Sequence, residues 1–221
     1  MLNLKHKNKI FQISCDGGAA TGKSTGAKML AQKYKLQFLS SGLLYRYVSY
    51  LILKNNPKNK IIFLKKKFKK LNYSKLSSIN LHSLKISEHT TIIAKNKEIR
   101  KILKKFQVDF AKKNKGCCIE GRDISTKILP NSDLKFFFKC NLNISAMRRY
   151  KELKKNNSKI KVKDVKKALR IRNLSDTRRK NSPLLKHRDS IVIDTGNLSK
   201  KEMLIKMSKY VERALNTKYG N

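Results

Sequence analysis

The sequence predicts an α/β fold in which a parallel sheet is covered by helices on both faces. Short apolar segments of strand length alternate along the 221 residues with longer segments of helical character, which is the order that parallel sheets require. A glycine-rich loop follows the first of these strands and leads directly into a helix. Hydrophobic residues make up 39% of the chain, which is enough for a core, so we expect one ordered domain despite the high charge.

The first half of the chain contains six predicted elements. In order, they are a strand at 9–15, a helix at 27–34, a strand at 36–39, a helix at 43–53, a weakly helical segment at 58–80 and one long helix at 86–111. The weak segment follows Pro57 and has apolar positions without clean periodicity.

The second half continues the alternation. Strands are predicted at 117–120, 134–139 and 190–194, and helices at 141–153, 162–171 and 200–215. Asn141 or Asn143 is expected to cap the first of these helices, and the polar segment 154–163 interrupts the pattern.

The charge of the chain is large and one-sided. Lys and Arg number 54 against 14 Asp and Glu, which gives a net charge of +40 and first suggests a nucleic-acid-binding protein. However, 43 of the basic residues are lysine and 11 are arginine. Lysine is a hydrated point charge, whereas arginine is the planar fork suited to binding phosphate and carboxylate. We therefore expect most lysines to be solvated background, and chemistry where the scarce arginines lie.

The cysteines and the apolar runs indicate the compartment. Cys15, Cys117, Cys118 and Cys140 form no CxxC pair and have no histidine at metal-ligand spacing, so we expect reduced, buried thiols in a cytoplasmic protein. No run approaches the roughly 18 apolar residues that a membrane helix needs. The apolar stretch after the basic residues 1–9 is too short for a signal peptide.

Residues 17–24 match the phosphate-loop pattern G-x-x-x-x-G-K-S/T, between a predicted strand and a predicted helix. Glycines let such a loop curl so that its N–H groups surround a phosphate, and the helix N-terminus adds positive potential. Lys23 would reach the β- and γ-phosphates and Ser24 would hold Mg²⁺. The pattern predicts a nucleoside triphosphate site made by Gly17, Gly18, Ala19, Ala20, Thr21, Gly22, Lys23, Ser24 and Thr25.

Five further motifs accompany the loop. They are Ser40-Ser-Gly-Leu-Leu-Tyr-Arg46, Glu98-Ile-Arg100, Glu120-Gly-Arg-Asp123, Ala146-Met-Arg-Arg149 and the spaced set Arg172-x-x-x-Asp176-x-x-Arg179-x-x-x-Pro183-Leu184. From Ile10 to about Leu215 the chain resembles the bacterial cytidylate kinases, members of the P-loop nucleoside monophosphate kinase family, with one weak stretch near 55–85. The Gly-Arg-Asp and Arg-x-x-x-Asp-x-x-Arg motifs are the more family-specific part, because many NTPases share a phosphate loop.

The resemblance implies a three-layer α/β/α P-loop kinase fold. It implies a core at about 9–53, 86–153 and 184–215, a shortened acceptor-binding insert at about 54–85 and a short lid at about 154–183. The implied reaction is the ATP-dependent phosphorylation of CMP, and of dCMP, by in-line transfer of the γ-phosphoryl group, with Mg²⁺ as cofactor. We expect a monomer whose partners are these small molecules, without a specific nucleic acid or a membrane.

The resemblance also implies roles for individual residues. Ser41 and Arg46 would hold the acceptor nucleotide, Arg100 its phosphate, and Thr91 the base through its hydroxyl. Arg122 and Asp123 would recognise cytosine and the pentose, while Asp176 would reach the sugar. Lys23, with Arg148, Arg149, Arg172 and Arg179, would surround the transferred group.

Seven of the 11 arginines fall on these motif positions, at 46, 100, 122, 148, 149, 172 and 179. A surface salt bridge, worth about 0–1 kcal/mol, is the alternative for any one of them, and it is our interpretation for Arg188 and Arg213. Together the seven favour phosphate and base recognition. The acceptor is a phosphate already ionised at neutral pH, so no general base is needed and catalysis should come from positioning and positive charge.

Besides the shortened insert and Thr91, which stands where the family has a serine, the chain departs from the family pattern at three positions, and alternatives for its function remain open. Ser40 replaces an aspartate, Gly18 a proline, and Glu120 an aspartate that would act near Mg²⁺. The first alternative is a kinase for another nucleoside monophosphate, such as UMP or both UMP and CMP. A nucleic-acid-binding protein is a more distant alternative, since no RNP- or KH-type motif is present. A GTPase-like switch is disfavoured because the chain lacks the N-K-x-D guanine motif.

Overall fold

The computed structural model describes residues 10–154 and 160–220. Met1–Lys9 and residues 155–159 lie outside these ranges. The first predicted strand was expected to begin at Lys9, and 155–159 belong to the predicted polar break and lid. The chain folds into two compact units. One contains Met1–Leu39 and Asn114–Asn221, and the other contains Ser40–Lys113.

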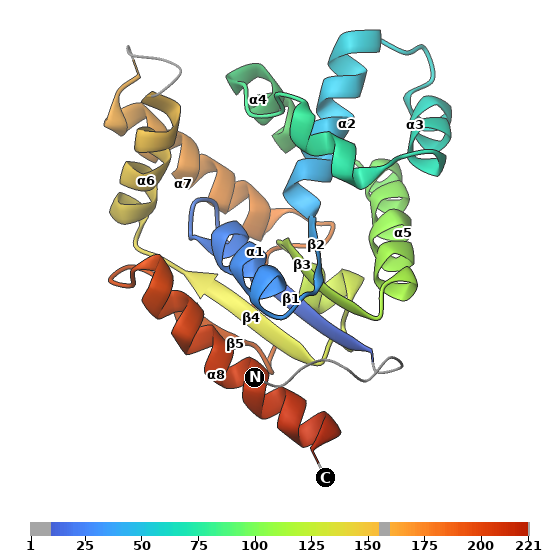
Figure 1. The fold of residues 1–221 in the computed structure, drawn as a ribbon. Helices are drawn as coiled ribbons and strands as arrows, with labels where there is room; N and C mark the ends of the chain where they lie inside the picture. Colours follow the sequence, from blue (N-terminus) through green and yellow to red (C-terminus); the bar gives the residue numbers. More distant parts are fainter. Residues whose placement is uncertain (1–9, 155–159, 221) are drawn as a thin grey trace. The chain divides into compact units, whose positions relative to one another are not determined.

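Five strands form the sheet of the first unit (Figure 1). They are β1 (Phe11–Gly17), β2 (Gln37–Ser40), β3 (Gly116–Gly121), β4 (Leu134–Lys139) and β5 (Ile191–Asp194). Their order is β2-β3-β1-β4-β5, and β1 pairs in parallel with both β3 and β4. The chain leaves β1 for β2 on one side and later crosses to β4 on the other. A ligand site is expected beyond the carboxyl end of a strand at such a switch point.

The helical elements of the first unit are α1 (Lys23–Lys33), η2 (Ile124–Ile128), α6 (Leu142–Lys154), α7 (Val162–Arg178) and α8 (Lys200–Tyr219). Helices α1 and α8 pack together against the sheet, where Leu30 and Met207 meet Phe136 in the main core. Helices α6 and α7 pack on each other, and a second small core joins them to the loop after β1 through Ala19.

The second unit is helical (Figure 1). It contains α2 (Ser41–Asn55), α3 (Lys60–Lys69), the 3₁₀ helix η1 (Tyr73–Ser78), α4 (Leu84–Ile93) and α5 (Lys97–Lys113). Helix α2 packs on α4, and α3 packs on α5. The Phe68 ring lies edge-on to Phe106, with 5.6 Å between ring centroids, so the weakly helical segment is ordered by aromatic contacts that its periodicity did not reveal.

The expected α/β fold with a parallel sheet is confirmed, and three local predictions need correction. The single helix predicted at 86–111 is two helices, because Asn96 breaks it and caps α5 by accepting from the Ile99 N–H at 3.0 Å. The helix predicted to end at Ile171 continues to Arg178. Sequence reasoning also missed η2, which follows β3. By contrast, Asn141 does cap the start of α6, accepting from the Asn143 N–H at 2.8 Å.

The four cysteines are free thiols. Three are buried, and the Sγ atoms of Cys15 and Cys118 lie 3.9 Å apart on neighbouring strands. Cys140 is half-buried, so the expectation of full burial is wrong for this residue, which directly follows the last residue of β4. In the described ranges, no helix is long and apolar enough to cross a membrane.

Candidate active site

The loop after β1 has the geometry that its glycines predict. Gly17 has φ +153°, and a Cβ there would lie 2.6 Å from the carbonyl oxygen of Phe138 on β4, so the strand pairing leaves no room for a side chain. Gly22 is left-handed, with φ +83°, at the N-cap of α1. Thr21 Oγ1 donates to the Gly18 carbonyl at 3.1 Å, which tightens the curl from within. The loop thus brings its backbone N–H groups to the start of α1.

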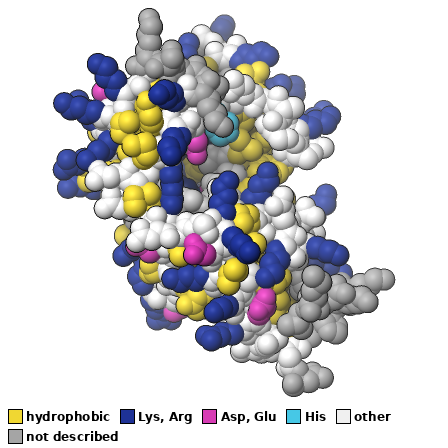
Figure 2. Space-filling model, turned by 60° about the vertical axis from the view of Figure 1, so that its left-hand side comes forward, with side chains coloured by type: hydrophobic (Ala, Val, Ile, Leu, Met, Phe, Trp, Pro, Cys, Tyr) yellow, Lys and Arg dark blue, Asp and Glu magenta, His cyan; other side chains and the backbone are white. Residues whose placement is uncertain are grey.

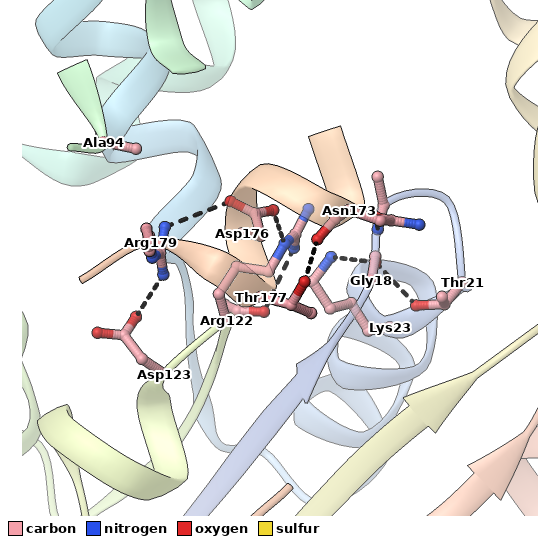
Figure 3. Close-up of polar contacts among 12 residues, drawn as sticks. Gly18, Thr21, Lys23, Ala94, Arg122, Asp123, Asn173, Asp176, Thr177 and Arg179 are labelled. Atoms are coloured by element: carbon pink, nitrogen blue, oxygen red, sulfur yellow. Dashed lines mark hydrogen bonds and ion pairs between the residues drawn. The ribbon is translucent and has the colours of Figure 1, made fainter. Parts of the chain in front are cut away.

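Lys23 is buried at the first position of α1 and points along the loop (Figure 3). Its Nζ donates to the Gly18 carbonyl at 3.3 Å and lies 3.7 Å from Oε2 of the buried Glu120 on β3. Burial and, to a lesser extent, the positive charge of Arg122 lower the pKa of Lys23 to about 8, while Glu120 opposes the shift. Ser24 and Thr25 follow it and are exposed. The lysine is therefore a partly desolvated cation that an anionic ligand would stabilise.

Four charged side chains form a compact network beside this loop (Figure 3). Asp176 on α7 accepts from Arg122 Nε at 2.8 Å and from Arg179 Nη1 at 3.3 Å. Arg179 Nη2 also lies 3.9 Å from a carboxylate oxygen of the buried Asp123. Burial acts to raise the pKa of Asp176, but Arg122, with Arg172 and Arg179, holds it below its usual value. Sequence motifs about 50 residues apart are therefore joined in one cluster.

Arg172 belongs to the same electrostatic environment. It is half-buried on α7, one turn before Asp176, and its charge lowers the pKa values of both Lys23 and Asp176. The structure thus brings together six of the predicted site residues in the first unit: Lys23, Arg122, Asp123, Arg172, Asp176 and Arg179.

The two arginines on α6 are placed differently from each other. Arg148 is fixed by Thr195, just beyond β5, through Nη1 to the hydroxyl at 2.9 Å and Nη2 to the carbonyl at 2.6 Å. Thr195 in turn donates its hydroxyl to the Thr21 carbonyl at 2.8 Å, so Arg148 is tied to the phosphate loop. Arg149 instead pairs with the exposed Glu152 on its own helix, at 2.8 Å, and the structure does not join it to the Lys23 cluster.

The remaining predicted residues lie in the second unit. Arg46 on α2 is buried, and its Nη1 donates to Ser87 Oγ at 2.7 Å and to the Leu81 carbonyl at 3.2 Å. Arg100 on α5 is also buried and donates to the Ala94 carbonyl at 3.1 Å. The Arg100 guanidinium lies over the ring of Tyr45, the neighbour of Arg46, at 5.5 Å. Each buried guanidinium is thus held in place by neutral groups.

Two hydroxyl residues of this unit were also predicted to bind ligand. Ser41 is buried at the start of α2, and Thr91 is half-buried on α4. The adjacent Thr90 is the more buried threonine, but its hydroxyl is engaged by the Ile86 carbonyl at 2.7 Å and by Ser49 at 3.0 Å. Thr90 therefore holds α2 to α4, and Thr91 stays the candidate for the base.

Burial separates the two kinds of basic residue as the composition predicted. Every described lysine except Lys23 and Lys135 is exposed, and Figure 2 shows basic side chains scattered over the face that it draws. The seven motif arginines are all buried or half-buried, whereas the four others are exposed: Arg170, Arg178, Arg188 and Arg213. Because removing a guanidinium from water costs free energy, this division marks the seven buried or half-buried arginines as candidates for a functional role.

The three departures from the family pattern each have a local partner. Ser40 caps α2 by accepting from the Leu43 N–H at 3.2 Å, so it retains the N-capping function open to an aspartate. Glu120 faces Lys23, as described above. A Cβ at Gly18 would lie 3.3 Å from Oδ1 of Asn173, so the small residue leaves space for that amide.

Sequence reasoning missed three residues that shape the site. Asp16 is buried and accepts from the Ile124 and Ser125 N–H groups, at 2.8 and 2.7 Å, which fixes η2 behind the loop. Burial raises the pKa of Asp16 to about 6, against the effect of these bonds. Asn173 accepts from the Ala19 N–H at 3.0 Å, and Thr195 holds Arg148. Asp16 and Thr195 each directly follow a predicted strand. A polar residue at that position could have been identified from the sequence as a candidate site residue.

Comparison with known proteins shows which sequences this chain is similar to. A family model described as cytidylate kinase matches residues 13–213. A cytidylate kinase of Bartonella tribocorum is 37% identical over 196 residues, covering 86% of this chain and 89% of that protein. A cytidylate kinase of Rickettsia akari is 32% identical, covering 97% of this chain and all of that protein.

Solved structures support the fold alone. An uncharacterized protein from Eubacterium ventriosum matches with a TM-score of 0.54 at 14% identity, covering 91% of this chain and 98% of that one. A protein from Thermus thermophilus matches with a TM-score of 0.52 at 13% identity, covering 94% and 99% of the two chains.

Proposed function

Because the chain belongs to the cytidylate kinase family, and so transfers the γ-phosphoryl group of ATP to CMP, we propose which of its residues carry that reaction. The burial of the seven motif arginines is the observation that supports the assignment most strongly. ATP and CMP are both polyanions, so the main barrier is to hold them together in line through a loose transition state. Positive charge that is shielded from water and already in position lowers such a barrier.

We assign ATP to the loop 17–25 of the first unit. The N–H groups of the loop and the start of α1 would bind the phosphates, and Lys23 would neutralise the β- and γ-oxygens. The lowered pKa of Lys23 fits this role, because the phosphates would supply the negative charge that its surroundings lack.

Mg²⁺ fits the same place. Within residues 10–154 and 160–220, no three His, Cys, Asp or Glu side chains gather into a metal-binding group. Mg²⁺, however, usually keeps several waters and is held by substrate phosphates with one or two protein oxygens. The exposed hydroxyl of Ser24, next to Lys23, supplies one such oxygen, and Glu120 supplies a carboxylate nearby. Bound there, the ion would neutralise charge on the β- and γ-phosphates.

We assign the CMP phosphate to Arg46 and Arg100, together with Ser41 at the start of α2. We assign the base to Thr91, Arg122 and Asp123. Asp123 is buried and would accept from the exocyclic amino group of cytosine, whereas uracil has a carbonyl at that position. Asp176 would accept from the sugar hydroxyls. The acceptor phosphate has a second pKa of about 6, so it attacks without a general base.

Arg148, Arg149, Arg172 and Arg179 would surround the transferred group. The bonds from Arg148 to Thr195 support a fixed position for this arginine. We assign 54–85 to the acceptor-binding insert and about 154–183 to the lid, and we place the reaction in the cytoplasm, with dCMP as a second acceptor.

The decisive experiment compares CMP, dCMP, UMP, AMP and GMP as acceptors, with ATP and Mg²⁺, by the release of ADP. We expect CMP and dCMP to be phosphorylated and UMP to be at least about a hundredfold poorer, since a site built for a donor rejects an analogue without one. Equal rates with UMP and CMP would remove Asp123 from base recognition and favour a dual-specificity kinase.

Matched arginine variants test the assignment of the site. Arg172→Ala and Arg179→Ala should each lower kcat/KM by about 10- to 100-fold, the loss expected for charge-assisted hydrogen bonds. Their neighbours on the same helix, Arg170 and Arg178, are exposed, so Arg170→Ala and Arg178→Ala are the controls and should change kcat/KM by less than about twofold. Equal losses in both sets would mean that burial does not mark function here.

A further inference from the structure

The phosphate loop is bound by a side chain that no sequence motif singled out. Asn173 on α7 places its amide oxygen 3.0 Å from the Ala19 nitrogen and accepts that N–H, and Figure 3 shows Asn173 lying beside the loop. Ala19 lies in the stretch 17–25 to which we assign ATP. The contact therefore joins the loop directly to the helix that carries Arg172 and Asp176.

Gly18 leaves room for this contact. A Cβ at Gly18 would lie 3.3 Å from Oδ1 and 3.5 Å from Nδ2 of Asn173, tighter than ordinary packing at the nearer atom. Position 18 is also where the sequence departs from the proline of the family pattern. The small residue and the amide therefore form a matched pair in this chain.

Asn173 lies where the inner face of α7 changes from apolar to charged. One turn before it, Leu169 packs in the small core that contains Ala19 and Ala146. Three residues after it, Asp176 binds Arg122. Ala19 is thus held on two sides, by its methyl group in the core and by its N–H on Asn173. An amide also adds an acceptor without adding negative charge near Lys23, where a carboxylate would compete with ATP.

We propose that Asn173 is a positioning residue that locks α7 onto the phosphate loop and so sets Arg172 and the Asp176–Arg122 pair against Lys23. The proposal rests on the function assigned above, because these groups are the ones that act on the transferred phosphoryl. Without this hydrogen bond, the loop would still bind ATP, but Arg172 and the Asp176–Arg122 pair would no longer be held in place relative to Lys23. The loss would appear in turnover rather than in ATP binding.

Steady-state kinetics of the full chain test the role. Asn173→Ala should lower kcat about five- to tenfold, the effect of one hydrogen bond of about 1–1.4 kcal/mol, and change the KM for ATP by less than about twofold. Asn173→Asp keeps the acceptor and should retain the larger part of kcat, while its added negative charge should raise the KM for ATP. The control is Thr177→Ala, one turn further along α7, where the hydroxyl bonds only to carbonyls of its own helix. An unchanged kcat in Asn173→Ala, or a fall in melting temperature with a parallel rise in KM, would overturn the proposal.

A double-mutant cycle tests the pairing with Gly18. Gly18→Ala should reduce kcat by pushing the amide away, but should add little in the Asn173→Ala background, since the contact is already lost there. Additive losses would contradict the pairing.

Amide hydrogen exchange measures the contact without any activity. The Ala19 N–H should exchange about tenfold faster in Asn173→Ala than in the wild-type chain and in Thr177→Ala. If the wild type fails to phosphorylate CMP, the proposed function falls, while this exchange measurement still decides whether the lock exists. Equal exchange in all three proteins refutes the lock itself.

Discussion

Removal of the Asp176 carboxylate tests whether the charged cluster beside the loop holds this unit together. Asp176 joins Arg122 and Arg179, and all three side chains are at most 14% exposed. With Asp123, the cluster contains two positive and two negative groups. Deleting Asp176 leaves one positive charge uncompensated in a site from which water is largely excluded.

The size of the effect follows from that burial. Breaking a buried ion pair by removing one partner costs about 3–5 kcal/mol, and we expect Asp176→Ala to lie near the lower end, about 3 kcal/mol, because Asp123 still faces Arg179. Asp176→Asn keeps one acceptor oxygen and should cost about 2 kcal/mol. For a chain of this length, about 3 kcal/mol corresponds to a fall in melting temperature of about 6–12 °C.

The stabilisation that the Asp176 carboxylate supplies should depend on pH in a definite direction. The pKa of Asp176 is held below its usual value in the folded state, by Arg122, Arg172 and Arg179 acting against burial. The stabilisation is therefore fully present above the unfolded-state pKa, about 3.9, and is lost as pH falls through the lower folded-state pKa. The difference between wild type and Asp176→Ala should be constant from about pH 5 to 8 and should shrink below about pH 4.

The assay is urea denaturation of both proteins across this pH range, followed by circular dichroism. Asp109→Asn is the matched control, because Asp109 pairs with Lys105 on the exposed face of α5 and should cost less than about 1 kcal/mol. A loss below about 1 kcal/mol in Asp176→Ala, or a difference from wild type that stays constant down to about pH 3, would refute the reasoning.

Three further predictions follow from buried groups near the loop. Gly17→Ala should lower stability by about 2 kcal/mol or more, because its Cβ would lie 2.6 Å from the Phe138 carbonyl oxygen; an unchanged melting temperature would contradict this close approach. The kcat/KM for ATP should decline as pH rises through about 8, since burial lowers the pKa of Lys23 to that value and its cationic form is the one that binds phosphate; a flat profile from about pH 7 to 9.5 would mean that the lysine stays charged. Asp16→Asn should cost about 1–3 kcal/mol in urea denaturation, because the amide cannot accept from both Ser125 and Ile124, and a neutral substitution would show that these N–H groups find other partners.

Local sequence patterns predicted the strands and the loop well because each rests on short-range chemistry. The run before Gly17 is apolar and the loop requires glycines, so β1 and the start of α1 follow from neighbouring residues. The break at Asn96 was missed because apolar periodicity continues across it, and only the cap on Ile99 shows where α5 begins. Helix α7 was predicted too short because its last turns contain Asn173, Ser175 and Asp176, which are poor helix formers. Tertiary contacts hold Asn173 and Asp176 in place.

The phosphate loop, the family and the division of the positive charge into 43 lysines and 11 arginines could all be identified from the order of the amino acids. The spacing of motif residues identifies them but carries no information about their partners. The folded chain was needed to show that Asp176 binds Arg122 and that Asn173 binds the loop. It was also needed to show that Arg148 is held by Thr195, whereas Arg149 pairs with a surface glutamate. Most of these contacts join residues that are far apart along the chain, and their strength depends on burial, which the packing of the sheet and helices creates.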